Sequence, residues 1–177
     1  MNILKIKGLS EFILGLVTLG LSGSLAAAEL AGTVIAIKGE VTAVMPSSEA
    51  RTLAKNTHVF VSDEVRTSPG GYAVIEFVDG ARATIRPDSK VVVKEYAFNT
   101  ADDGALLDLV KGGLRCITGG IAKKRPESYR VKAGVATLGV RGTEFSLRIC
   151  ENDCAEEELR FADGRLAGHG VELLSAK

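Results

Sequence analysis

Short alternations of apolar and polar residues recur along the chain from residue 32 onward. Segments in which every second residue is apolar are typical of half-buried β-strands. The segments with this pattern, separated by Gly, Pro, Asp and Ser, are 32–44, 58–68, 72–78, 81–87, 90–98, 105–118, 129–140, 143–150 and 157–166. No long stretch has a helical period, and residues 47–57 are most simply a loop. The pattern predicts an all-β single domain of short, mostly antiparallel strands, as a sandwich or roll or as a solenoid.

The hairpin of residues 72–87 can be aligned residue by residue. A loop of residues 78–80 places Phe77 opposite Ala81 and keeps all the apolar residues of both strands on one face. A two-residue turn would mix the two faces, because a slip of one residue turns every side chain over. We therefore predict the three-residue loop, with Gly80 at positive φ as such loops require.

The segment VATLGVRGTEFSLRIC, residues 135–150, changes face in its middle. Its apolar residues occupy even positions up to Val140 and odd positions from Phe145 onward. One extra residue in a strand, a β-bulge, restores the apolar side to the core. We predict this bulge at Arg141 and Gly142, since glycine adopts the left-handed conformation most readily.

The first 28 residues have the features of a secretory signal peptide. Lys5 and Lys7 precede an apolar run at 12–21, and small residues follow up to Ala28. This run is shorter than the roughly 20 apolar residues that a membrane-spanning helix needs. We expect cleavage after Ala28, which leaves one domain, residues 29–177, in the periplasm as a soluble protein.

Charge and motif content exclude several classes of function. The chain has 22 basic and 22 acidic residues, a balance that argues against nucleic-acid binding and against general attraction to an anionic membrane. His58 and His169 are its only histidines, and neither lies in a catalytic or metal-binding motif. We therefore expect a protein that is not an enzyme and that needs no cofactor or metal.

Two charged segments deserve separate interpretations. Asp102 and Asp103, within 99–104, lack the spacing of a calcium loop and are interpreted as a solvated turn. The basic residues of segment 122–130 would suit an anionic glycan or an acidic partner, but a solvated loop is the favoured interpretation.

Three cysteines enter an oxidising compartment if the chain is exported. If the chain reverses at residues 151–153, Cys150 and Cys154 become directly opposed at a distance that a disulfide can bridge. We predict this disulfide. Cys116 lies in an apolar segment and is expected to be buried as a free thiol.

Several segments together resemble the FecR domain, a periplasmic all-β family. These are GTVIAIKGEVTAV at 32–44, the central block at 59–93, LVKGGLRCITG at 109–119 and VATLGVRGTEF at 135–145. The central block contains Asp63 and the Asp79–Gly80 turn. The closing segment ends in Arg141, Gly142, Thr143 and an aromatic residue, as the family's signature does.

The resemblance implies a module for protein interaction or ligand sensing. In the best-known members the domain is the periplasmic part of a transmembrane anti-sigma regulator, which receives a signal from an outer-membrane transporter of iron-siderophores. This sequence resembles a stand-alone exported form without the cytoplasmic and membrane-spanning parts. An envelope protein or envelope ligand is the expected partner, and a cell-wall or polysaccharide-binding module is the alternative.

The matched polar positions also give candidate contact residues. We predict that Arg141 pairs with Asp63 or Glu64, because these acids occupy the other matched polar position of the family. A structural clamp between strands is favoured over a contact with an anionic ligand, since an arginine satisfies several acceptors at once.

Overall fold

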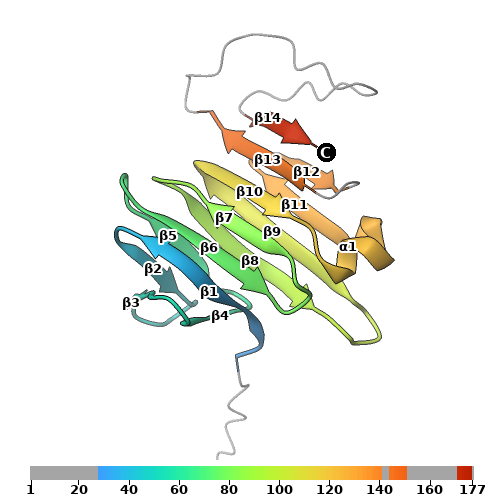
Figure 1. Ribbon diagram of the computed structural model, residues 1–177, viewed down its shortest axis with the longest axis horizontal. Coiled ribbons are helices and arrows are strands. Elements are labelled where there is room, and N and C mark those ends of the chain that lie inside the picture. The colour runs from blue at the N-terminus through green and yellow to red at the C-terminus, as the bar shows by residue number, and fades with distance from the viewer. Residues whose placement is uncertain (1–27, 141–143, 151–170, 177) are drawn as a thin grey trace, which may run out of the picture.

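The computed structural model describes residues 28–140, 144–150 and 171–176 and shows two sheets around one hydrophobic core (Figure 1). The first sheet has, in spatial order, β14 (Val171–Ala176), β13 (Glu144–Ile149), β10 (Gly113–Ile117), β7 (Arg82–Ile85), β6 (Tyr72–Phe77), β1 (Leu30–Lys38) and β4 (His58–Phe60). The second has β12 (Ala136–Gly139), β11 (Tyr129–Ala133), β9 (Gly104–Lys111), β8 (Lys90–Ala97), β5 (Glu64–Thr67), β2 (Val41–Val44) and β3 (Arg51–Thr52).

The strand pairs are antiparallel except for β9 with β11. Alternating residues of each strand point into the core, so both sheets contribute small and branched apolar side chains to it. The prediction of an all-β single domain of mostly antiparallel strands is therefore confirmed. Residues 1–27 of the predicted signal peptide, and the strand predicted at 157–166, lie outside the described residues. Within the described ranges, no helix is long and apolar enough to cross a bilayer.

The β6–β7 hairpin has the predicted register. Ile75 pairs with Ala83, and the Phe77 amide donates to the Ala81 carbonyl over 2.8 Å. Gly80 has a φ of +81°, as the three-residue loop requires. The predicted register is confirmed, because both strands belong to one sheet and share one buried side.

The β-bulge predicted at Arg141 and Gly142 is wrong. Strand β12 ends at Gly139 in the second sheet, whereas β13 begins at Glu144 in the first sheet. The parity of the buried positions, that is, whether they are odd- or even-numbered, is preserved only within one strand. It can change when the chain leaves one sheet and enters the other. The apolar residues on both sides of the change face the same core from opposite sheets.

The same crossing explains the segment predicted as one strand at 105–118. It consists of β9 in the second sheet and β10 in the first, separated by Gly112 at a φ of +76°. The hydrophobic core residues are odd-numbered in β9, such as Leu109, and even-numbered in β10, such as Leu114. At two places in the described part of the chain, a change of parity close to a glycine thus accompanies a crossing from one sheet to the other.

Candidate functional site

The connection from β10 to β11 folds into two short helical segments at one end of the sandwich. These are α1 (Gly120–Lys124) and the 3-10 helix η1 (Pro126–Ser128). A Cβ on Gly119 would lie 2.4 Å from the Ala81 nitrogen, and one on Gly120 would lie 2.8 Å from the Phe98 ring. Only glycine permits so close an approach, so this pair lets α1 begin directly against the β6–β7 loop.

Asp79 fastens that loop to α1 and to β8. Its carboxylate accepts hydrogen bonds from the Tyr96 hydroxyl at 2.7 Å, the Ala81 amide at 3.0 Å and the Ile121 amide at 3.1 Å. The side chain is buried, and the Tyr96 ring stacks on Phe77 with centroids 4.2 Å apart. Burial raises the pKa of Tyr96 well above its usual range, so its hydroxyl stays protonated and donates. Asp79, matched to the family by sequence, is therefore a structural anchor.

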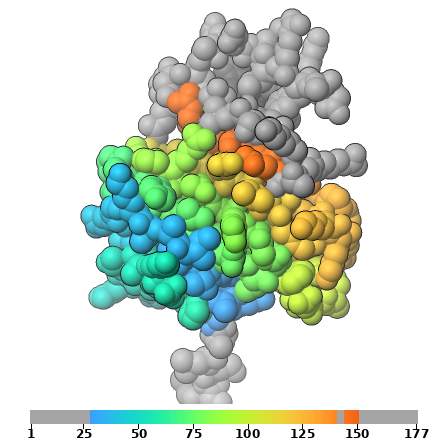
Figure 2. Space-filling model, in the orientation of Figure 1, coloured from blue at the N-terminus to red at the C-terminus, as the bar shows by residue number. Residues whose placement is uncertain are grey.

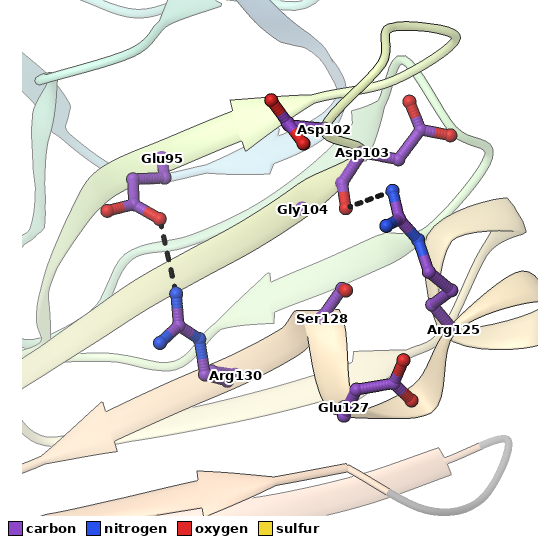
Figure 3. Close-up of a pocket in the computed structure, with 8 residues that line it drawn as sticks. All are labelled: Glu95, Asp102, Asp103, Gly104, Arg125, Glu127, Ser128 and Arg130. Atoms are coloured by element: carbon purple, nitrogen blue, oxygen red, sulfur yellow. Dashed lines mark hydrogen bonds and ion pairs between the residues drawn. The ribbon is translucent and has the colours of Figure 1, made fainter.

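Beside this anchor the two charged segments of the sequence meet. In Figure 2 the α1 region, in orange, lies against the yellow-green β8–β9 turn. Between them is an open cavity of about 260 Å³, which we name the charged depression (Figure 3). It is lined by Glu95, Asp102, Asp103, Gly104, Arg125, Glu127, Ser128 and Arg130.

The arginines of the charged depression already have partners in the protein. Arg130 forms an ion pair with Glu95 at 3.3 Å, and Arg125 donates to the Asp103 carbonyl at 3.3 Å. Outside the depression, Lys124 lies 3.6 Å from the Asp103 carboxylate. The basic segment is thus held against the acidic one, and the two solvated loops expected from the sequence form a single structure.

Asp103 organises the acidic wall. Its carboxylate accepts the Thr100 amide at 2.7 Å, and this hydrogen bond, together with Lys124 and Arg125, holds the pKa of Asp103 below its usual range. Lys124 in turn lies over the Phe98 ring, 4.7 Å from its centroid. A carboxyl with a lowered pKa stays ionised until the pH falls below its usual range, so these contacts persist in mildly acidic solution.

Two carboxylates of the charged depression remain available for contact with a ligand. Asp102 and Glu127 are exposed, and within the described parts of the chain no cation pairs with either. Figure 3 shows them on opposing segments, the β8–β9 turn and η1. Four acids and two arginines line the depression, so its electrostatic balance is acidic. A contact of segment 122–130 with an anionic partner, one interpretation of the sequence, therefore has little support at this site.

The acids proposed as partners of Arg141 are paired with other cations. Arg51 makes a two-pronged contact with Asp63, which is fully buried, and its second nitrogen also donates to the His58 carbonyl at 3.2 Å. Glu64 pairs with Arg66 at 2.5 Å. Residues 141–143 lie outside the described residues, so the roles of Arg141, Gly142 and Thr143 stay predictions.

Cys116 is fully buried beside the Tyr129 ring, as expected, and it is free. Burial raises the pKa of its thiol to about 12. Cys150 directly follows β13, whereas Cys154 lies outside the described residues. The disulfide between these two residues therefore stays a prediction.

Thiol counting checks both expectations. In air-purified native protein, we expect no rapid reaction with a disulfide reagent at pH 8, because the buried Cys116 has almost no thiolate at that pH. In denaturant, one thiol per chain should react if Cys150 and Cys154 are joined. Three reactive thiols would contradict the disulfide, and a fast reaction in the native state would contradict the burial of Cys116.

Comparison with known proteins places the chain in a family. The FecR protein family model matches residues 63–164, more than half of the chain. A solved structure described as "Cell surface anchoring domain" is 29% identical, covers 42% of this chain and 99% of its own, and has a TM-score of 0.38. No curated protein matches the chain. The chain belongs to the FecR family, a family of regulatory domains and not a known family of enzymes.

Proposed function

We propose that the protein is an exported, non-catalytic interaction module that binds a protein partner of the periplasm through the charged depression. The observation that carries this proposal is the convergence of two separate charged segments on one open cavity of about 260 Å³. Membership of a regulatory family favours a binding role. The residues that line the cavity supply charged and polar contacts but include no histidine or cysteine.

The walls of the depression are held in place before any partner arrives. Asp79 fixes the start of α1, and Asp103 fixes the β8–β9 turn through Thr100. Preformed sites lose less conformational entropy on binding, so weak charged contacts suffice for a specific complex. Asp102 and Glu127, exposed on opposite walls, are the groups that a partner would meet first.

A sugar-binding site built from aromatic platforms has little support in this fold. Tyr96 and Tyr129 are core residues, and of the three tyrosines only Tyr72 reaches the surface, with 36% of its area exposed. A module that binds neutral sugars needs flat apolar surfaces on which the sugar rings can pack. We therefore favour a protein partner over a neutral sugar as the ligand of this module.

The test is affinity capture from solubilised envelopes with the double variant Asp102→Asn/Glu127→Gln. The amounts of captured proteins should fall about tenfold relative to the wild type, because two charged contacts are lost. The matched control Glu40→Gln/Glu49→Gln removes two exposed acids outside the depression and should capture as much as the wild type. Equal capture by wild type and by the Asp102/Glu127 variant would reject the depression as the site. Sedimentation with peptidoglycan, unaffected by either variant, would favour the cell-wall alternative.

A further inference from the structure

A second charged feature crosses the outer face of the first sheet. Lys38 of β1 lies opposite Tyr72 of β6, and Gly113 of β10 lies opposite Arg148 of β13. Between these pairs, Arg86 follows β7 and donates its amide to the Gly113 carbonyl over 2.9 Å. These residues form a line perpendicular to the strands, which we name the basic row. With neighbouring strands about 4.8 Å apart, the row from Lys38 to Arg148 is roughly 19 Å long.

The alternation of side chains shows that the basic row faces outward. Each of its members is next in sequence to a residue whose side chain is in the core or packed against it. Four of these neighbours, Ala73, Ile85, Leu114 and Leu147, are core residues, and the fifth, Ile37, is partly buried against the core. The row also lies at the opposite end of β6 from the loop 78–80, against which α1 and the charged depression are built.

The basic row differs from the neighbouring rows in how its charges are balanced. Further along the same face, Arg82 is paired with Glu76 at 2.8 Å and Arg115 with Glu144 at 2.7 Å. In contrast, no acid within the described residues pairs with Lys38 or Arg86. Arg148 lies opposite Glu172 of β14 and has a further partner within the chain, so the unpaired cations of the row are Lys38 and Arg86.

Arg86 is held flat on the sheet. A Cβ on Gly113 would lie 2.7 Å from the Arg86 Cδ, so the stem of the arginine occupies the space that a larger residue would fill. The stem therefore lies over Gly113 of β10, on the side of β7 away from Tyr72. An arginine with spare donors binds carboxylate or phosphate groups through two parallel hydrogen bonds.

We propose that the basic row binds a linear anionic polysaccharide of the cell envelope, a function separate from the capture of a protein at the charged depression. Lys38 and Arg86 lie on one line across the strands, an arrangement that suits the regularly spaced negative charges of a linear polymer. Tyr72 lies between Lys38 and Arg86, where its ring offers an apolar surface to a sugar and its hydroxyl offers a polar contact. The net charge of the chain is zero, so attraction to a polyanion must come from a local patch and not from the whole molecule.

A flat anionic membrane fits this face less well. Surface-bound proteins insert several apolar side chains beside their basic residues. Among the described side chains of this sheet's strands, the exposed large aliphatic residues are Leu30, at the start of β1, and Ile117, at the end of β10. Ile117 lies in the row of Arg82 and Glu144, apart from the basic row.

The experiment measures binding of the mature protein to polygalacturonate, a linear polyuronate, by calorimetry at low salt. The variant Lys38→Gln/Arg86→Gln should bind about tenfold more weakly than the wild type. The control Lys55→Gln/Lys123→Gln changes the net charge equally, outside the row, and should bind as the wild type does. Binding should weaken as the NaCl concentration rises, because salt screens exposed charges.

Several results would overturn the proposal. These are no binding by the wild type, an equal loss in the control, or equal binding of polyglutamate or of vesicles rich in phosphatidylglycerol through the same residues. If Arg86→Gln lowers the melting temperature, the variant Lys38→Gln/Tyr72→Ser provides the same readout on a folded protein. Loss of polyuronate binding with unchanged capture of protein at the charged depression separates this proposal from the proposed function.

Discussion

Replacing Asp79 by alanine should lower the free energy of unfolding by about 3–5 kcal/mol, as measured by urea denaturation. The carboxylate is buried and accepts three hydrogen bonds, so its removal leaves the Tyr96 hydroxyl and the Ala81 and Ile121 amides without an acceptor. Each unsatisfied buried donor costs about 1–3 kcal/mol. The same change releases α1 and should therefore also reduce partner capture at the charged depression.

Two variants control for this effect. Asp79→Asn keeps one oxygen as an acceptor and should cost less than the alanine change. Asp88→Asn removes the charge of a side chain that is 59% exposed and paired with Lys111, and asparagine tolerates the left-handed backbone of this position, with its φ of +53°, so the stability should change by less than about 1 kcal/mol. If Asp79→Ala unfolds at the same urea concentration as Asp88→Asn, Asp79 is not the anchor of α1.

Arg51→Ala should be about as destabilising, by about 3–5 kcal/mol. Arg51 holds both carboxylate oxygens of Asp63, which is fully buried and also accepts the Phe60 amide at 2.7 Å. Removing the arginine leaves a buried negative charge without a counter-ion. Thermal and urea denaturation both measure the loss.

The double change Arg51→Met/Asp63→Leu tests the cause of that loss. Apolar side chains in place of a buried ion pair are often tolerated, so the double variant should be more stable than Arg51→Ala. Arg66→Ala breaks an exposed pair with Glu64 and should cost less than about 1 kcal/mol. A melt of Arg51→Ala that equals that of Arg66→Ala would contradict the role given to the Arg51–Asp63 pair.

Local patterns predicted the strands and the β6–β7 hairpin well. Residues 72–87 form a hairpin within one sheet, so the apolar residues and the turn at Gly80 contain all the information on register. The segment 135–150 carries an equally clear pattern, but its two halves belong to different sheets. A change of parity has two explanations, a bulge and a sheet crossing, and only the pairing partners distinguish them.

The candidate site was less accessible from the sequence, because it depends on which loops meet. The segments 99–104 and 122–130 each read as solvated loops, and their contact through Lys124 and Asp103 is a consequence of the fold. Helix α1 spans five residues, too few to show a periodic pattern. The glycines before it were the available signal, since consecutive glycines indicate a close approach of backbone to a neighbour.

The ion pair of Asp63 is a second contact between distant segments that local sequence patterns do not reveal. The family resemblance predicts that Asp63 or Glu64 pairs with Arg141, whereas the cation bound to Asp63 in the described structure is Arg51. Arg51 lies in the short strand β3, within a segment that the sequence indicated as a loop. A strand of two residues gives no periodic signal, so its long-range pairing appears only in the fold.

The most direct test of the central claim, that the charged depression is the contact surface of an interaction module, is photo-crosslinking in intact cells. A photoreactive residue replaces Ser128 inside the depression or, as a comparison, Glu49, which is exposed and outside it. We expect one discrete crosslinked protein from position 128, none from position 49, and loss of that product when Asp102→Asn and Glu127→Gln are added. The same product from both positions, or a product from position 128 that persists in the presence of both substitutions, would contradict it.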